Sequence, residues 1–453
     1  MDNILERVVE SPAVALGHAI NLSKFVGKTI KNQKHVKKGQ EYWESLGPGL
    51  TTGASDDDPS GIATYSQTGA HFGFQLLWLA PLTFPLMAVV QEMCARIGLV
   101  TGQGLAGNIR DHFPKWILYL STILLLIANT INIGADLGAM AKATQLLLPN
   151  VRFGILIFFF TGFSLALQIF TPYEKYAKYL KWLALILLSY VLSAFMVNMD
   201  WKHLLAHTLV PIITFSKEQI ILVCAILGTT ISPYLFFWQT SQEVEEDIKS
   251  GKHTLESRQG CSNEDIRKMR VDVWSGMFLS NLVMFFIIAA CAATLYTHGI
   301  TNITTAADAA AALRPIAGDY TYLLFTLGII GTGLLAVPVL AGAVSYCLSE
   351  SFGWQFGLHH ELKEANAFYG VIIISMAVGL ALNFIGLDAI RALIYSAVVN
   401  GLIAPVILAL IVILSSSKKL MGKRVNHPAV TILGWIVTGI MALAGIGTIL
   451  SLF

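Results

Sequence analysis

Long apolar segments separated by short polar ones run through almost the whole chain. Eleven such segments are rich in Leu, Ile, Val, Ala and Phe, at residues 46–72, 75–100, 116–142, 153–171, 179–199, 216–242, 271–297, 320–348, 367–386, 388–413 and 429–452. An α-helix rises about 1.5 Å per residue, so about 20 residues cross the apolar core of a bilayer. The pattern therefore predicts an all-α polytopic membrane protein with about 11 transmembrane helices.

The composition supports this prediction and narrows the function. Of the 453 residues, 55% are hydrophobic and 13% are charged, whereas soluble domains carry about 25% charged residues. The net charge is only +2, and the basic residues form short clusters between apolar segments, which gives no sign of a nucleic-acid partner. The five cysteines include no CxxC pair, so neither a zinc site nor a disulfide framework is expected. Nothing in the sequence indicates a cofactor or an obligate protein partner.

The distribution of basic residues predicts the orientation in the cell (plasma or inner) membrane. When successive loops are assigned to alternating sides, 24 of the 30 Lys and Arg residues fall on the side of the N-terminus and five on the other side. By the positive-inside rule, the N-terminus is expected in the cytoplasm and the C-terminus outside. Residues 1–45 then form a cytoplasmic tail. Its moderately apolar residues 11–22 fit either an amphipathic surface helix or part of a disordered basic leader.

Two apolar segments carry helix-breaking residues near their middle. Segment 46–72 contains three aspartates at residues 56–58, directly before Pro59, and segment 216–242 contains Pro233. Proline removes a helical hydrogen bond, so both helices are expected to break. Ordinary proline kinks are the alternative. The aspartates weigh against it, because a carboxylate at the bilayer centre costs about 2.5–3.5 kcal/mol and marks a functional site by default.

The two broken segments are the first and the sixth of the series. This placement predicts a five-plus-five inverted repeat of the APC/LeuT-like type, in which discontinuous helices 1 and 6 meet at the substrate site near the bilayer midplane. Residues 46–453 are then one transport domain. Its first repeat covers about 46–200, its second about 216–413, and an extra helix about 429–452.

The residues around the breaks resemble a known family. The run GPGLTTGASDDDPSGIATYSQTGAHFGFQLLW and the following ARIGLVTGQGLA resemble the first two helices of the Nramp (natural resistance-associated macrophage protein) divalent metal transporters. The run ILGTTISPYLFF resembles their sixth helix. The resemblance implies a metal ion held between the unwound parts of helices 1 and 6.

The predicted metal site departs from the family pattern. The first-helix motif Asp-Pro-Gly-Asn reads DPSG at residues 58–61, so the carboxylate of Asp58 is kept and Gly61 replaces the amide ligand. In the sixth helix, Thr229 stands at the carbonyl-ligand position and Ser232 replaces the methionine thioether. Oxygen ligands suit Mg²⁺, Ca²⁺ and Mn²⁺, whereas thioethers suit softer ions. The chain thus resembles the Nramp-related magnesium transporter branch, with a roomy site for a largely hydrated Mg²⁺ ion. An unchanged manganese site with altered packing is the alternative.

Further polar residues are expected along the permeation pathway, each with an alternative role. Asp57 either attracts cations or caps the second half of the broken helix, and Asp56 is left unassigned. Asn400 either binds metal-bound water or hydrogen-bonds a neighbouring helix. Glu92 is expected to pair with Arg96 one turn further on.

The residues that carry protons in the family are mostly replaced. In the third helix Asp136 matches the first family acid, but Ala139 replaces the glutamate, and Tyr234 replaces the histidine after the sixth-helix proline. A tyrosine with a pKa near 10 is a poor proton relay at neutral pH. We therefore expect import of Mg²⁺, and also of Mn²⁺, without obligatory proton coupling.

Other functions remain as alternatives. One is a proton-coupled Mn²⁺/Fe²⁺ transporter of the same family, and another is a sodium-coupled amino-acid symporter of the same fold. The aspartates would repel the carboxylate of an amino-acid substrate. An enzyme is not expected, because the sequence has no catalytic motif such as HExxH or a phosphate-binding loop.

Overall fold

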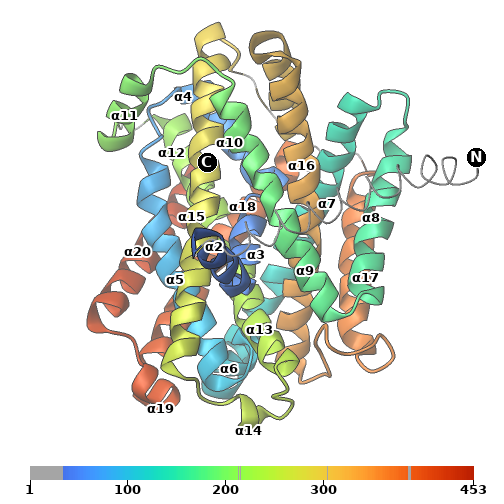
Figure 1. Ribbon diagram of the computed structural model, residues 1–453, viewed down its shortest axis with the longest axis vertical. Coiled ribbons are helices and arrows are strands. Elements are labelled where there is room, and N and C mark those ends of the chain that lie inside the picture. Colours follow the sequence, from blue (N-terminus) through green and yellow to red (C-terminus); the bar gives the residue numbers. More distant parts are fainter. Residues whose placement is uncertain are drawn as a thin grey trace, which may run out of the picture. The chain divides into compact units, whose positions relative to one another are not determined.

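The computed structural model describes residues 34–212, 214, 216–301, 303, 305–385 and 389–452. The chain divides between Leu46 and Gly47 into two units. The described part of the first unit forms helix α2 (Lys34–Ser45), and the surface helix considered for residues 11–22 lies outside the described residues. In the second unit, every regular element of the described part is a helix (Figure 1). The all-α prediction is confirmed.

Helices occupy each of the eleven predicted segments. In chain order they are α3 (Pro48–Asp56) with α4 (Pro59–Phe72), α5 (Leu79–Thr101), α7 (Lys115–Leu147), α8 (Phe153–Phe170), α9 (Tyr173–Leu183) with η1 (Ala184–Leu187) and α10 (Leu188–Phe195), α12 (Lys217–Thr230) with α13 (Pro233–Lys249), α15 (Asn263–Thr294), α16 (Ala306–Phe352), α17 (Asn366–Leu382), α18 (Ala389–Ser416) and α20 (Pro428–Leu452). Short helices lie between them: α6 (Leu105–His112), α11 (Trp201–Leu209), α14 (Leu255–Arg258), η2 (Tyr296–His298), α19 (Lys418–Met421) and η3 (Gly422–Arg424). Within α16, non-helical backbone at Gly318 (φ 86°) separates two helical parts.

Length and hydropathy single out most of these helices as membrane spans. In the part of the chain that the structure describes, eight helices are long and apolar enough to cross a membrane. A ninth is added if Ile403–Ser416 and its bent continuation Lys418–Arg424 count as one span. The helix α17 is short, with 17 residues, and the first segment is divided into helices of 9 and 14 residues. The short α17 and the divided first segment therefore account for the two predicted spans that are not among these nine.

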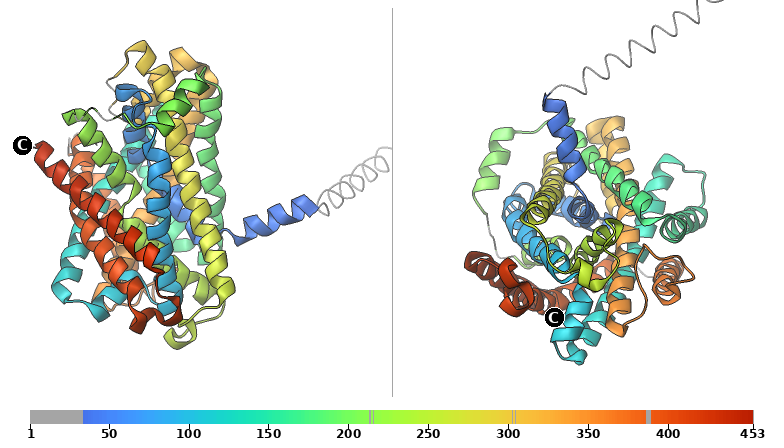
Figure 2. Two further views of the ribbon diagram at one scale, coloured as in Figure 1. Left: turned by 90° about the vertical axis from the view of Figure 1, so that its left-hand side faces the viewer. Right: turned by 60° about the horizontal axis from the view of Figure 1, so that its bottom comes forward.

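The helices differ in how far the rest of the unit covers them. The apolar stretch of α5 is 83% buried, whereas that of α20 is 22% buried, and α20 lies at the edge of the bundle (Figure 2). On α8, Phe158 and Phe159 are exposed. Outward-facing apolar side chains on long helices are expected where lipid surrounds a protein, so the fold is that of a multi-pass membrane protein.

The glycines that precede the aspartates have a packing role. Helix α3 is regular, and a Cβ atom on Gly49 would clash with the backbone of Val273, while one on Gly53 would clash with the backbone of Gly276. The absence of side chains lets α3 cross α15 at close range, as small residues do in membrane helix pairs. The interruption of the first span is thus confined to Asp57 and Asp58.

One carboxylate that the sequence did not single out holds the start of α3. Asp272 of α15 accepts hydrogen bonds from three backbone N–H groups, through Oδ1 from Gly47 (2.7 Å) and Leu50 (3.0 Å) and through Oδ2 from Gly49 (2.6 Å). The first N–H groups of a helix have no partner within the helix. Asp272 therefore fixes the beginning of α3 across the α3–α15 contact.

Candidate metal site

The first span breaks between α3 and α4, as predicted. Asp58 has extended backbone (φ −66°, ψ 166°) and precedes Pro59, the first residue of α4. Its Oδ1 accepts hydrogen bonds from the Gly61 N–H (2.7 Å) and the Ser60 hydroxyl (2.6 Å). Asp58 is therefore the N-cap of α4, a role that the sequence analysis considered for Asp57. The hydrogen bonds that Asp58 receives from the described residues all fall on Oδ1, so Oδ2 remains as an acceptor or ligand.

The second break lies between α12 and α13, again as predicted. Ser232 has extended backbone (φ −86°, ψ 132°) directly before Pro233. Its hydroxyl donates to the carbonyls of Gly228 (2.9 Å) and Thr229 (2.8 Å). The Thr229 hydroxyl donates to carbonyls one turn earlier in α12, at 3.1 Å. Both hydroxyl hydrogens are thus directed into α12, and only their oxygen lone pairs are available to a cation.

Two tyrosines connect the breaks. The Tyr234 hydroxyl donates to the carbonyl of Ser55 (2.9 Å), one of the last carbonyls of α3, which have no partner within the helix. The Tyr65 hydroxyl of α4 shares a hydrogen bond with the Thr230 hydroxyl of α12 (3.4 Å). Tyr234, predicted on the pathway, is buried and holds the two broken helices together. The sequence analysis did not single out Tyr65, although it lies one helical turn after Gly61.

The surroundings of Gly61 are tighter than the sequence analysis assumed. A Cβ atom at this position would lie 3.2 Å from the Asp56 carbonyl oxygen, 3.4 Å from Asp58 Oδ1 and 3.5 Å from the Tyr65 hydroxyl. The expected open space is therefore absent directly beside Gly61. Instead, three oxygen atoms from both sides of the break face this glycine, so a larger residue would displace these oxygens.

Two predicted pathway residues are buried acids without partners. The carboxylates of Asp57 and Asp136 are fully buried, and none of their four oxygens has a hydrogen-bond partner among the described residues. Asp136 of α7 lies near Ser60 and within electrostatic reach of Asp58, so the structure brings it to the first helix break. Asp56 differs, because its Oδ2 accepts a hydrogen bond from Ser280 (3.0 Å).

Asn400 of α18 is 3% exposed, and its Oδ1 has no hydrogen-bond partner in the described part of the chain. Helix α18 packs against α5, α7 and α12. Among the described residues of these helices, no donor bonds the side-chain oxygen of Asn400. The role of Asn400 toward metal-bound water stays a prediction.

In the part of the chain that the structure describes, the acids at the breaks do not converge on one point as a multi-acid chelate would. Among the described residues, no three His, Cys, Asp or Glu side chains gather closely enough to hold one metal ion. This agrees with a site in which one carboxylate, Asp58, is joined by hydroxyl and backbone oxygens. Glu92, by contrast, is a structural acid: it accepts from Arg270 (2.9 Å) and Trp274 (2.8 Å), and the predicted partner Arg96 lies 4.0 Å away.

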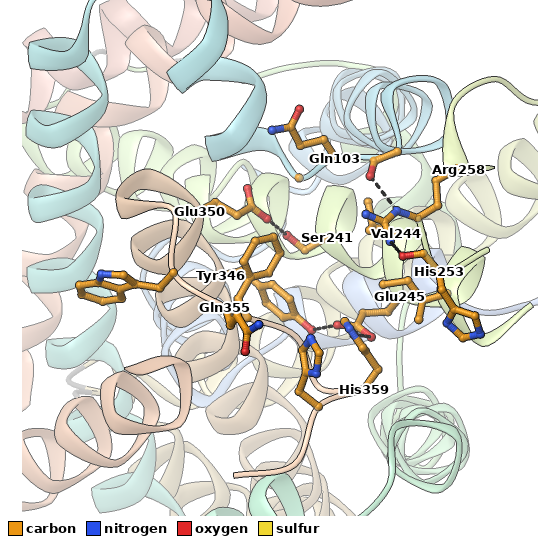
Figure 3. A pocket seen from close by; sticks show the side chains of 16 residues that line it. Gln103, Ser241, Val244, Glu245, His253, Arg258, Tyr346, Glu350, Gln355 and His359 are labelled. Atoms are coloured by element: carbon orange, nitrogen blue, oxygen red, sulfur yellow. Dashed lines mark hydrogen bonds and ion pairs between the residues drawn. The ribbon is translucent and has the colours of Figure 1, made fainter. Parts of the chain in front are cut away.

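A second polar cluster lies around a cavity of about 300 Å³ that α13, α14, the end of α16 and residues 102–104 border (Figure 3). Here Glu245 accepts hydrogen bonds from the Tyr346 hydroxyl (2.6 Å) and the Leu358 N–H (2.9 Å), and it pairs with His359 (2.9 Å). Glu350 accepts from the Gly107 N–H (2.9 Å) and the Ser241 hydroxyl (3.2 Å). These acids hold separate elements together. We call this group the end-pocket cluster.

A bundle in which two interrupted helices face each other defines the class of secondary transporters with a substrate site at the helix breaks. Comparison with known proteins gives the family. The chain matches the family described as natural resistance-associated macrophage protein-like over residues 49–451. It therefore belongs to the Nramp family.

Relatives and solved structures agree with this assignment. The chain is 26% identical over 404 residues to the divalent metal cation transporter MntH of Klebsiella pneumoniae (strain 342), covering 87% of this chain and 91% of that protein. It is 26% identical over 408 residues to MntH of Aeromonas hydrophila, covering 87% and 93%. A crystal structure of the Eremococcus coleocola manganese transporter, in complex with an aromatic bis-isothiourea substituted compound, has a TM-score of 0.69 and 18% identity, covering 90% of this chain and 86% of that one. That likeness shows the fold.

Proposed function

We propose that this protein imports a hard, largely hydrated divalent cation, Mg²⁺ and also Mn²⁺, by alternating access at the two helix breaks. The observation that carries the proposal is the donor set: a carboxylate, Asp58, in the first break and the hydroxyl oxygens of Thr229 and Ser232 at the second. Oxygen donors favour hard ions. Magnesium keeps several of its waters when one or two carboxylates bind it, so few protein ligands suffice.

The names of the relatives support divalent metal transport in general. The MntH proteins are called divalent metal cation transporters, and the similar solved structure is a manganese transporter. These names fit a transporter better than an enzyme. The preference for Mg²⁺ rests on Ser232, which stands where the family pattern has a thioether. Its hydroxyl caps α12 through Gly228 and Thr229, so the change is built into the local structure.

Transport without obligatory proton coupling is part of the proposal. Tyr234 replaces the family histidine, and its hydroxyl is bonded to the Ser55 carbonyl. The membrane potential can drive the uptake, because two charges crossing about 100 mV gain about 4.6 kcal/mol. A proton-coupled Mn²⁺ transporter is the second candidate, and the buried Asp136 within reach of Asp58 favours it.

We further propose a cytoplasmic N-terminus and an outer C-terminus, which reporter fusions at both ends test.

The test is metal uptake into proteoliposomes with an imposed potential, comparing Mg²⁺, Mn²⁺ and Ca²⁺. Asp58→Ala is expected to lower uptake by about 100-fold or more, because even residues that only support a metal ligand contribute about 10–100-fold. The matched control is Asp200→Ala. Asp200 caps α11 as Asp58 caps α4, but it is exposed, so uptake should stay unchanged. Equal uptake by Asp58→Ala and the unaltered protein contradicts the proposed site.

A pH-sensitive dye in the same vesicles tests the coupling. We expect Mg²⁺ entry without internal acidification. Acidification at a rate comparable to metal entry would establish the proton-coupled alternative.

A further inference from the structure

Asp57 is one of the acids at the breaks that the proposed metal site does not use. Its side chain is 0% exposed, and neither carboxylate oxygen has a hydrogen-bond partner among the described residues. No basic side chain of the described chain forms an ion pair with it. An isolated ionised carboxylate in an apolar interior is strongly unfavourable. The fold therefore leaves a buried carboxyl group whose ionised form a cation from outside can balance.

Hydroxyl groups from three other helices lie in the neighbourhood of this carboxylate. Ser280 of α15 lies beside Asp57, although its hydroxyl donates to Asp56 Oδ2 (3.0 Å). The Tyr190 hydroxyl of α10 is buried within electrostatic reach of Asp57 and has no hydrogen-bond partner in the described structure. Thr332 of α16 lies next to this hydroxyl and donates to the carbonyl of Ile329 (3.3 Å). The oxygens of all three hydroxyls keep lone pairs that a cation can use.

Glycines of α16 place these hydroxyls at the depth of the first break. The ring of Tyr190 packs directly on Gly328, where any Cβ atom would clash with it. A Cβ atom on Gly333 would lie 3.4 Å from Pro59 Cγ, so α16 passes the break one turn further along. Thr332 precedes Gly333 in the chain. The cluster is thus assembled from four segments of the chain that meet where α3 ends.

We propose that Asp57, Tyr190, Ser280 and Thr332 form a second cation site, which takes a small hard monovalent ion of the Na⁺ type. The site is distinct from the one at Asp58, whose neighbours are Ser60, Gly61 and Asp136. A divalent ion fits it less well, because Mg²⁺ gives up its waters reluctantly and the carboxylate is fully enclosed. The inference goes beyond the proposed transport function and does not depend on which metal is carried.

Equilibrium binding of ²²Na⁺ to the purified detergent-solubilised protein tests the site directly. We expect saturable binding that unlabelled Na⁺ displaces and that choline and Mg²⁺ do not. Asp57→Asn should abolish it. Tyr190→Phe removes one oxygen and keeps the ring, and should weaken binding about fivefold or more, which corresponds to about 1 kcal/mol. The matched control is Tyr176→Phe, since Tyr176 is equally buried and its hydroxyl also has no described partner.

The outcomes separate this site from the metal site. Asp58→Ala should keep ²²Na⁺ binding while losing metal uptake, and Na⁺ should raise the thermal unfolding temperature of that variant by about 2 °C or more over choline at equal ionic strength. No saturable binding would overturn the inference, as would equal binding by Asp57→Asn, or displacement by Mg²⁺ in Asp58→Ala. Binding of ²²Na⁺ by a protein that moves no metal would refute only the proposed transport.

Discussion

Buried acids occur in two regions of this protein, and the fold treats them in opposite ways. In the end-pocket cluster, Glu245 accepts hydrogen bonds from Tyr346 and Leu358 and pairs with His359, while Glu350 accepts from Gly107 and Ser241. At the helix breaks, Asp57 and Asp136 are equally buried and receive no hydrogen bond from the described residues. The carboxylates are thus bonded in the first region, whereas in the second only Asp56 and Asp58 accept hydrogen bonds from the described residues.

The difference separates structural acids from functional ones. A bonded carboxylate holds its donors in place, and its loss leaves those donors unsatisfied in a buried setting. A carboxylate without hydrogen-bond partners stabilises no neighbouring group, and its buried charge is energetically unfavourable until a cation binds. Substitutions in the end-pocket cluster are therefore expected to change stability, whereas substitutions of Asp57 and Asp58 at the breaks should change ion binding more than stability.

The largest effect on stability is expected from Glu245→Ala. This change removes the acceptor for the Leu358 N–H and the Tyr346 hydroxyl, and should lower the free energy of unfolding by about 3 kcal/mol. Thermal unfolding of the purified protein measures it. Glu264→Ala is the matched control. Glu264 forms an exposed ion pair with Lys268 on α15, so its loss should cost much less stability than the loss of Glu245. Similar losses in both variants would remove the distinction between the regions.

A smaller effect is expected from Ser232→Met at the second break. A thioether returns a soft ligand to the position, so the uptake ratio of Mn²⁺ to Mg²⁺ should rise about tenfold, or about 1.4 kcal/mol. Competition between the two ions in proteoliposomes gives the ratio. Ser275→Met places the same side chain on the exposed side of α15 and should leave the ratio unchanged. An unchanged ratio in Ser232→Met would mean that this position does not contact the ion.

The smallest effect is expected from Asp136→Asn. Because Asp136 receives no hydrogen bond from the described residues, neutralising it should change the free energy of unfolding by less than about 1 kcal/mol. Without obligatory proton coupling, Mg²⁺ uptake should stay within about twofold of the unaltered protein. A loss of uptake together with a lost pH dependence would instead assign Asp136 to a proton pathway. Glu350→Gln, the corresponding amide change in the end-pocket cluster, should lower stability more.

Much of the fold could be predicted because local chemistry specifies it. Apolar segments long enough to cross a bilayer must satisfy their backbone groups as helices, and Pro59 and Pro233 cannot continue the helix that precedes them. The segments, both breaks and the broken-helix architecture follow from such local rules. The assignment of Asp58, Thr229 and Ser232 to the metal site came instead from the resemblance of these segments to the Nramp motifs, and it stays a prediction.

Tertiary structure decided how these parts are bonded, and here the sequence was insufficient. Asp272 caps α3 from more than two hundred positions away, Tyr234 bonds the Ser55 carbonyl, and Tyr65 meets Thr230. Each bond depends on which helix faces which, and a helical period cannot specify that. The choice between Asp57 and Asp58 as the cap of α4 depended on the backbone angles at the break. That Asp57 receives no hydrogen bond from the described residues likewise depends on how α3, α10, α15 and α16 pack together, since burial and hydrogen bonding are properties of the packed helices.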